Sequence, residues 1–136
     1  MIITDNVGDY SDEITNIVLR NEEAFGKVTL SDMVRAHFHA VLINDDVAGF
    51  FAISKYRHDD FDEAVLCFVY VHSHFRRKGI FGKIVEFVVE KCRECKLIGL
   101  WAESGNELAK SIYSRKFKFI FEDSNGDCYY AIKDER

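Results

Sequence analysis

The stretch from Val65 to Glu90 constrains the fold more than any other part of the chain. Residues 65–71, VLCFVYV, form a short run rich in β-branched and aromatic residues, which predicts a strand covered on both faces. Apolar residues recur at helical spacing across residues 80–92, and a basic turn with one glycine, residues 72–79, separates the two segments. The sequence therefore predicts a buried strand, a basic turn and an amphipathic helix.

A basic turn that leads into a helix is suited to bind phosphate. Free backbone N–H groups and the positive end of the helix dipole point at the anion there. Arg76, Arg77 and Lys78 would add cationic attraction. A solvated surface loop has the same composition, so the turn alone does not decide between the two interpretations.

Length and charge limit the classes of protein that remain. The chain has 136 residues, which predicts a single domain over residues 1–136. Its formal charge of -5 disfavours binding to nucleic acid, which depends on cationic neutralisation of phosphates. No stretch approaches the roughly 20 apolar residues of a membrane span, and the acidic N-terminus lacks a signal-peptide core. We therefore expect a cytoplasmic protein that binds neither nucleic acid nor a membrane.

Two pairs of residues resemble metal ligands but lack partners. Cys92 and Cys95 form a CxxC, yet no second Cys or His pair follows at zinc-site spacing, so we expect small buried hydrophobic residues. His37 and His39 share a strand face, and the sequence offers no third ligand beside them. No metal site is predicted.

The first part of the chain predicts one strand, two helices and a hairpin. The strand is residues 2–4; one helix runs from Ser11, its expected N-cap, to Gly26, and a short second helix follows a cap at Thr29 or Ser31 and extends through Ala36. The hairpin spans residues 38–53, with its turn at 44–46 and a bulge or close backbone contact at Gly49, and residues 56–63 are expected to form a polar loop.

The second part predicts one parallel strand pair and a final hairpin. Residues 97–103 form a strand parallel to residues 65–71, because a helix connects them. A helix capped by Asn106 leads to a strand at 117–121, with its three phenylalanines on one side, and Asn125-Gly126 turns the chain into a last strand at 128–133. The fold class is α+β: a mixed, mostly antiparallel sheet of six to seven strands with helices on its faces.

The order of these elements and two motifs resemble the GNAT superfamily of acyl-CoA-dependent N-acyltransferases across nearly the whole chain. The sequence RRKGIF at 76–81 resembles the family's diphosphate-binding motif, with Arg76 and Gly79 matching and Phe81 standing in place of a small residue. VHSHF at 71–75 resembles the segment that precedes it. Asn106, Ala109, Tyr113 and Phe117 resemble a second family block, although the glycine usual before Phe117 is absent.

The resemblance implies a central parallel strand pair that splays apart around acetyl-CoA. Backbone amides near Val69, Tyr70 and Val71 would pair with the pantetheine and polarise the thioester. The turn would hold the diphosphate; its residues are Arg76, Arg77, Lys78, Gly79, Ile80, Phe81 and Gly82. By the same resemblance, Asn106 would contact the pantetheine and Tyr113 would protonate the departing thiolate. A core aromatic with a solvated hydroxyl is an alternative for Tyr113.

The general base is the least determined part of the site. Glu103 at the end of the second parallel strand is the first candidate, and His72 and His74 beside the turn are others. Attack without a protein base, through water, is also possible. Family resemblance implies that the first helices and the final hairpin shape acceptor specificity, which draws attention to Glu22, Glu23 and Asn125.

The expected activity is acetyl transfer from acetyl-CoA to the primary amine of a small molecule or protein. A non-catalytic acyl-CoA-binding module with a regulatory or assembly role is the alternative, and a nucleotide-binding protein of another fold is a third. An exposed strand edge at the final hairpin is compatible with a monomer or a homodimer.

Overall fold

A seven-stranded sheet in the order β1-β2-β3-β4-β5-β7-β6 forms the centre of the computed structural model, which describes all residues, 1–136. The strands are β1 (Ile2–Thr4), β2 (His37–Ile43), β3 (Asp46–Arg57), β4 (Asp62–Val71), β5 (Leu97–Ala102), β6 (Lys118–Glu122) and β7 (Cys128–Asp134). Only β4 and β5 are parallel; every other neighbouring pair is antiparallel. The predicted α+β fold with one central parallel pair is confirmed.

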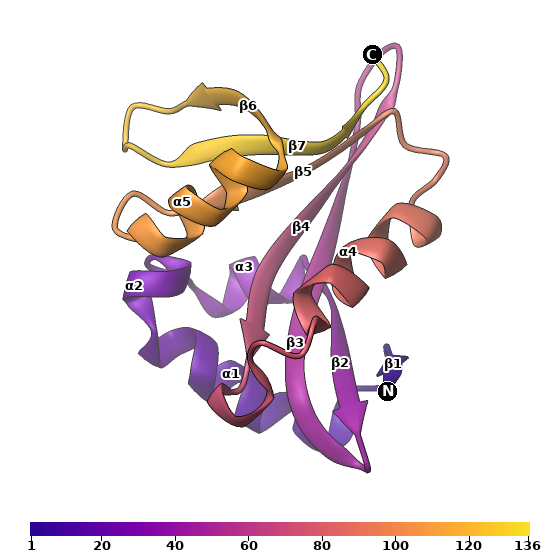
Figure 1. Cartoon of the computed structure of the whole chain (residues 1–136), viewed down its shortest axis with the longest axis vertical. Helices are drawn as coiled ribbons and strands as arrows, with labels where there is room; N and C mark the ends of the chain where they lie inside the picture. Colours follow the sequence, from indigo (N-terminus) through magenta and orange to yellow (C-terminus); the bar gives the residue numbers. More distant parts are fainter.

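Helices cover both faces of the sheet, as predicted (Figure 1). On one face lie α4 (Ile80–Lys91) and α5 (Glu107–Lys116). On the other lie α1 (Ser11–Arg20), α2 (Glu22–Phe25) and α3 (Leu30–Val34). Two short 3-10 turns, η1 (Gly8–Tyr10) and η2 (Ser73–Phe75), precede α1 and α4. None of the helices combines the length and the apolar composition that a membrane-spanning helix needs.

Alternation along the strands divides the apolar residues between two layers. The larger core lies under α4 and contains Leu66, Ile84, Ile98 and Leu100, each at most 1% exposed. A smaller core packs α1, α2 and α3 against the opposite face of the sheet. Cys92 and Cys95 are buried at the end of α4 and its following turn, where they pack as small hydrophobic residues, as expected.

Several boundaries differ from the prediction. The segment 56–63 is not a loop: β3 continues through Arg57 and β4 begins at Asp62, so only residues 58–61 connect the two strands. The segment is mostly polar because this end of the hairpin extends beyond the helices (Figure 1). The helix expected from Ser11 to Gly26 is broken at Asn21 into α1 and α2.

The predicted helix caps have mixed outcomes. Ser11 does not cap α1; its hydroxyl donates to the Gly8 carbonyl instead. Thr29 does cap α3, because its side chain accepts from the Asp32 N–H while the Asp32 carboxylate accepts from the Thr29 N–H. The turn of the first hairpin is tight, with Asn44 and Asp45 both at positive φ.

A bulge in the last hairpin overturns the prediction for its phenylalanines. Between Phe119 and Phe121 the register with β7 shifts by one residue. Phe119 packs edge-to-face on Tyr130, whereas Phe121 packs on Trp101 and Tyr129. The two phenylalanines therefore lie on opposite faces of β6, because the extra residue reverses the alternation.

Candidate functional site

A cleft opens where the two parallel strands separate. Their ladder has four residue pairs, from Glu63 opposite Leu97 to Leu66 opposite Leu100. Beyond this point β4 and β5 diverge, with the N-terminal end of α4 on one side of the opening and α5 on the other (Figure 1). The backbone edges of both strands face the cleft there without a strand partner.

A β-bulge in β4 begins at the same place. One extra residue lies between Cys67, which pairs with Ala52, and Tyr70, which pairs with Phe50. Phe68 takes a φ of +53°, in the left-handed region that a bulky side chain rarely adopts. Its ring is held by Phe25 and Phe38, at centroid distances of 6.1 and 5.4 Å. Aromatic packing from α2 and β2 therefore stabilises the backbone distortion that turns β4 away from β5.

Close packing of β3 supports the bulged part of β4. A Cβ atom added to Gly49 would lie 2.3 Å from the Tyr70 carbonyl oxygen, so no other residue fits at this position. The close backbone contact predicted at Gly49 is confirmed, as is a bulge beside it in the pairing of β2 with β3.

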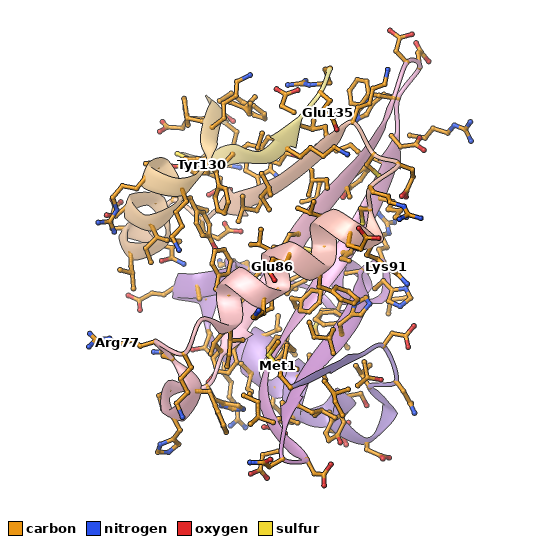
Figure 2. The ribbon with its side chains drawn as sticks, turned by 45° about the vertical axis from the view of Figure 1, so that its right-hand side comes forward. Met1, Arg77, Glu86, Lys91, Tyr130 and Glu135 are labelled. Carbon is orange, nitrogen blue, oxygen red and sulfur yellow. The ribbon has the colours of Figure 1, made fainter.

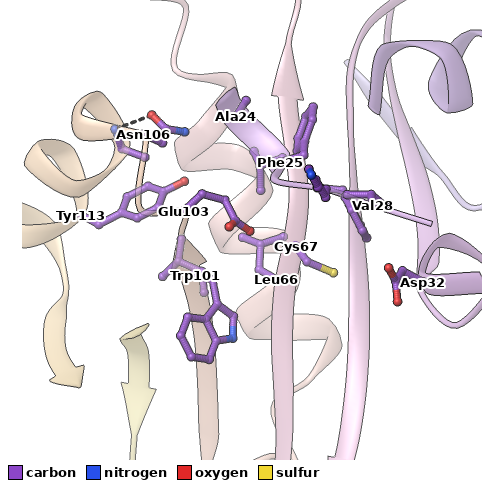
Figure 3. Close-up of a pocket in the computed structure, with 15 residues that line it drawn as sticks. Ala24, Phe25, Val28, Asp32, Leu66, Cys67, Trp101, Glu103, Asn106 and Tyr113 are labelled. Atoms are coloured by element: carbon purple, nitrogen blue, oxygen red, sulfur yellow. Dashed lines mark hydrogen bonds between the residues drawn. The ribbon is translucent and has the colours of Figure 1, made fainter. Parts of the chain in front are cut away.

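The cleft has a volume of about 290 Å³ and is mostly apolar. Four of the predicted site residues line it: Val69, Glu103, Asn106 and Tyr113. They come from β4, the end of β5 and α5, so the fold brings together residues that lie far apart in the sequence. In Figure 3, the Glu103 carboxylate lies in the middle of the cleft, and the Tyr113 hydroxyl points toward it.

Glu103 is a carboxyl group with an unusual environment. Partial burial, together with the nearby carboxylates of Asp127 and Asp123, raises the pKa of Glu103 to about 7, and burial is the largest of these causes. A Cβ atom added to Gly26 would lie 2.9 Å from Oε2 of Glu103, so the loop after α2 closes over this carboxyl group. Near neutral pH such a group both accepts and releases protons, as a general base requires.

Tyr113 presents a phenol to the same space. Burial raises its pKa to about 12, so the hydroxyl stays protonated at neutral pH. Its ring stacks on Phe81 at 5.8 Å and meets Tyr130 edge-to-face at 5.8 Å. No protein group hydrogen-bonds the Tyr113 hydroxyl. Since no buried polar side-chain atom lacks a partner, this hydroxyl is accessible from the cleft. The hydroxyl is therefore oriented by packing of its ring and remains free to donate to a ligand.

Asn106 has one fixed and one free end. Its Oδ1 accepts a hydrogen bond from the Ala109 N–H at 3.1 Å, which caps α5 as predicted. The side-chain NH₂ has no protein acceptor, and the residue lines the cleft (Figure 3). The cap holds the amide rigidly, so its free donors are available to a bound molecule.

The basic turn presents a row of free backbone donors. Arg77 and Gly79 both have positive φ, at 63° and 75°, and α4 begins directly after them. The N–H groups of residues 77–82 have no acceptor within the protein. Such a turn at the start of a helix suits an anion through its backbone alone.

The side chains of the turn have different surroundings. Nε of Arg76 donates to the Val71 carbonyl at 2.9 Å, which ties the turn to the end of β4. Arg77 extends into solvent (Figure 2), and Lys78 lies over the Phe75 ring at 5.5 Å. Ile80 is buried in the core, and Gly82 has open space around it.

Phe81 does not lie over the free N–H groups of the turn. Its ring faces α5, where it stacks on Tyr113 and meets Phe117 edge-to-face at 6.3 Å. The unusual side chain therefore fills space between α4 and α5. The glycine usual before Phe117 is not needed in this chain. Phe117 is extended, with φ of -130°, so the end of α5 needs no left-handed residue.

Other predicted candidates lie away from the cleft. The Tyr70 side chain stacks on Phe50, and that of Val71 packs on the main core, so only their backbones lie along the strand that borders the opening. His72 contacts Glu13 and the Tyr70 hydroxyl, each at 3.3 Å, and His74 is exposed. Neither histidine lines the cleft.

His37 and His39 gain no third ligand. Their rings stack at 5.0 Å, and His39 is buried against Phe51. No group of three or more His, Cys, Asp or Glu side chains is arranged to hold a metal ion. Glu22, Glu23 and Asn125 are exposed or peripheral and do not line the cleft, although their neighbours Ala24 and Phe25 do.

Several residues of the site were not found from the sequence, among them Trp101, Cys67 and Asp127. Trp101 lines the cleft two residues before Glu103, and strand alternation predicts that they share a face. Cys67 lines it because β4 loses its partner there, and burial raises the pKa of its thiol to about 11, so it remains a neutral thiol. Asp127 approaches Glu103 across the final hairpin, a contact that only the sheet order creates.

Comparisons with known proteins agree with this architecture. A model of the acetyltransferase (GNAT) family matches residues 9–119. A GNAT-family acetyltransferase from Staphylococcus aureus is 17% identical, with a TM-score of 0.74 and 99% of each chain covered. A ribosomal-protein-alanine N-acetyltransferase from Brucella melitensis is 17% identical, with a TM-score of 0.68 over 96% of this chain and 98% of that one.

A third solved structure contains coenzyme A. It is the N-acetylglutamate synthase from Neisseria gonorrhoeae complexed with coenzyme A and N-acetyl-glutamate; it is 12% identical, with a TM-score of 0.75 over 99% of this chain and 35% of that chain. These structures share the fold, and no curated protein sequence matches this chain. Since the family model covers most of its length, the chain belongs to the GNAT family of acetyltransferases.

Proposed function

We propose that residues 1–136 act as one N-acetyltransferase domain that moves the acetyl group of acetyl-CoA to a primary amine by direct attack on the thioester. The observation that carries this proposal is the cleft between β4 and β5. It has the free N–H groups of residues 77–82 near one end and the Glu103 and Tyr113 side chains within it. One opening thus combines a place for a diphosphate with two groups that exchange protons.

Binding of acetyl-CoA is supported by donors that have no other partner. The backbone N–H groups of residues 77–82 would hold the diphosphate, with Arg77 and Lys78 adding long-range attraction. The unpaired edge of β4 from Val69 to Val71 would pair with the pantetheine amides, and the NH₂ of Asn106 would donate to the same arm. An N–H group on this edge would polarise the thioester carbonyl.

Acetyl transfer to an amine also needs a group that accepts a proton, and Glu103 is suited to that role. An amine attacks only in its neutral form, and the positively charged nitrogen that forms on attack must lose a proton. Glu103 would accept that proton directly or through water, because its raised pKa places it near neutrality. Its neighbours Asp123 and Asp127 add negative charge that attracts the incoming ammonium group.

Tyr113 would stabilise the departing sulfur. Its phenol, with a pKa of about 12, is a weaker acid than a thiol, whose ordinary pKa is about 8.5. Complete transfer of the phenolic proton to the thiolate is therefore uphill. A hydrogen bond from the phenol to the developing thiolate lowers the barrier without that transfer, and solvent or the released proton completes protonation.

Calorimetry with acetyl-CoA and a thiol-release assay with a panel of primary amines test the proposal. We expect binding by the unmodified protein and at least a tenfold loss of affinity in Gly79→Glu, which places a carboxylate in the turn. Gly79→Ala is the matched control, because it places a side chain at the same positive φ and in the same open space without a charge. Equal affinity in both variants would contradict the assignment of the turn, and binding without thiol release for any amine would identify a non-catalytic module.

A further inference from the structure

A second pocket adjoins the cleft on the same face of the sheet. It has a volume of about 420 Å³, and Trp101 lines both spaces. Leu97, Trp101 and Glu103 alternate with β5 residues whose side chains enter the core under α4. Their side chains therefore point to the opposite face, where the pocket continues from the cleft toward the tip of the β3–β4 hairpin.

The pocket has a partly exposed aromatic lining. Trp101 meets Phe121 edge-to-face at 5.3 Å and contacts Tyr129 at 4.9 Å. Trp101 is 37% exposed and Phe121 is 44% exposed. Helices α1, α2 and α3 cover this face only over β2, β3 and β4, so the part over β5, β7 and β6 stays open (Figure 1).

The charged groups around the pocket are already paired. The Tyr129 hydroxyl donates to Glu63, and His58 contacts the other carboxylate oxygen of Glu63 at 2.8 Å. Arg136 makes two hydrogen bonds to Asp134, at 2.9 and 3.1 Å. No unpaired charge thus remains to bind a charged group, and the occupant that fits is apolar and uncharged at this end.

The cleft differs from the pocket, because it suits a positively charged group. Glu103, Asp123 and Asp127 gather three carboxyl groups there, and Asp32 and Lys27 also line the cleft, so acidic groups outnumber the basic one and favour a cation. Trp101 and Glu103 are two residues apart on one strand face, or about 6.6 Å along the strand. A ligand that contacts both needs a nitrogen at a similar distance from the centre of its apolar part, which a ring on a short linker provides.

Size supports an occupant with one or two rings. An apolar cavity of about 150 Å³ holds a benzene molecule, and small-molecule pockets in proteins span about 300–1,000 Å³. The second pocket, at about 420 Å³, is large enough for a flat ring system with space for water at its mouth.

We propose that the pocket formed by Phe61, Trp101, Phe121 and Tyr129 binds the body of the amine acceptor, and that the acceptor is a small primary amine carrying an aromatic or similarly flat apolar group. This rests on the proposed acetyl transfer, with the amine nitrogen at Glu103. Phe121 then determines specificity for the acceptor, because it lines the pocket and not the cleft, whereas Trp101 lines both.

Fluorescence tests the pocket without requiring activity. Trp101 is the only tryptophan of the chain and lines both the pocket and the cleft, so coenzyme A is kept at a constant saturating concentration while the amine is varied. In the presence of coenzyme A, we expect 2-phenylethylamine to change the emission saturably, and n-butylamine at equal concentration to leave it nearly unchanged. Equal responses to the two amines, or no response to either, would overturn the proposal.

Two exposed phenylalanines of β6 provide a matched pair of variants. Phe121→Ser should weaken the 2-phenylethylamine response about tenfold, whereas Phe119→Ser should leave it unchanged, because Phe119 lies on the opposite face. The same pattern is expected in the KM for 2-phenylethylamine. Equal effects of both variants would argue against the pocket.

The outcomes separate this inference from the proposed function. Thiol release with aliphatic amines and no preference for aromatic ones would leave acetyl transfer intact and reject the aromatic acceptor. A saturable fluorescence response without thiol release would keep the pocket as an amine site and reject the transferase. Emission that depends on protein concentration and not on amine would show a second copy on this face, which also overturns the proposal.

Discussion

The two halves of β4 show how one strand contributes to both stability and the candidate site. Residues 63–66 pair with β3 on one side and with β5 on the other. Residues 67–71 pair with β3 alone, and their other edge borders the cleft. We call residues 63–66 the closed half of β4 and residues 67–71 the open half. The closed half buries Ala64 and Leu66 in the main core, at 0% and 1% exposure, while the open half has only partly buried side chains.

The difference arises from backbone geometry more than from composition. Both halves are rich in apolar residues, and both would suit a continuous strand. The extra residue at the bulge and the positive φ of Phe68 turn the second half away from β5. Hydrogen-bonding capacity that would otherwise complete the sheet is thereby left for a ligand.

The largest expected effect is a loss of stability from a substitution in the closed half of β4. Leu66→Ala should lower the free energy of unfolding by about 3 kcal/mol, because it leaves a cavity in the main core. Val69→Ala in the open half, which borders the cleft, should cost about 1 kcal/mol or less. Urea denaturation of both variants measures the contrast, and equal losses would show that the two halves do not differ in their contribution to stability.

The second effect concerns the phenol of Tyr113, which α5 presents to the cleft beside the open half of β4. Tyr113→Phe should lower the rate of thiol release by about 100-fold while the affinity for acetyl-CoA changes less than threefold, because only the donor to the leaving sulfur is removed. Tyr130→Phe is the control: it removes a hydroxyl that contacts Ser114 outside the cleft. An unchanged rate in Tyr113→Phe would leave this residue with a packing role alone.

Much of the fold could be predicted from the sequence, because it depends on local patterns. The period-two alternation, the Asn106 and Thr29 caps and the Asn125-Gly126 turn each indicate an element from a few neighbouring residues. The errors lie where residues from distant elements decide. The alternation of the last phenylalanines fails at a bulge in β6, and the predicted loop at 56–63 is strand because β3 and β4 extend beyond the helices.

In the candidate site, too, local motifs could be recognised from the sequence, whereas contacts between distant elements could not. The basic turn, Asn106 and Tyr113 stand out because they resemble family motifs. Asp127 affects Glu103 only because the sheet order places the final hairpin beside β5. The orientation of Phe81 depends on how α4 and α5 pack, which no local pattern specifies.

The third effect concerns pH. For the unmodified protein, kcat/KM should rise through a midpoint near pH 7 as Glu103 loses its proton. Glu103→Gln should lose this rise and fall about tenfold at about pH 8, whereas Glu107→Gln on the exposed side of α5 should keep it. A pH profile that is the same in all three proteins would argue for attack without Glu103.

Thermal unfolding gives an independent check on Glu103. Its pKa is higher in the folded protein than its ordinary value of 4.5, so the folded state binds more protons between pH 4.5 and about 7. The contribution of Glu103 to stability therefore falls as pH rises through this range. Glu103→Gln removes the penalty and should raise Tm by about 2–4 °C at about pH 8, with no gain at about pH 4.

The smallest effect tests what sets the width of the cleft beside the open half of β4. No strand ladder joins β4 to β5 there, and the Phe81 ring connects α4 to α5 by stacking on Tyr113. Phe81→Ala should therefore reduce the rate of thiol release about fivefold by loosening the Tyr113 ring, with acetyl-CoA affinity within twofold, because the free N–H groups of the turn remain. Phe87→Ala, which removes a ring on the same helix that packs on His39 and Phe51, controls for lost stability. A loss of acetyl-CoA affinity larger than the loss of rate would instead place Phe81 in the binding of the donor, and the width of the cleft would then depend on the ligand and not on the contact between α4 and α5.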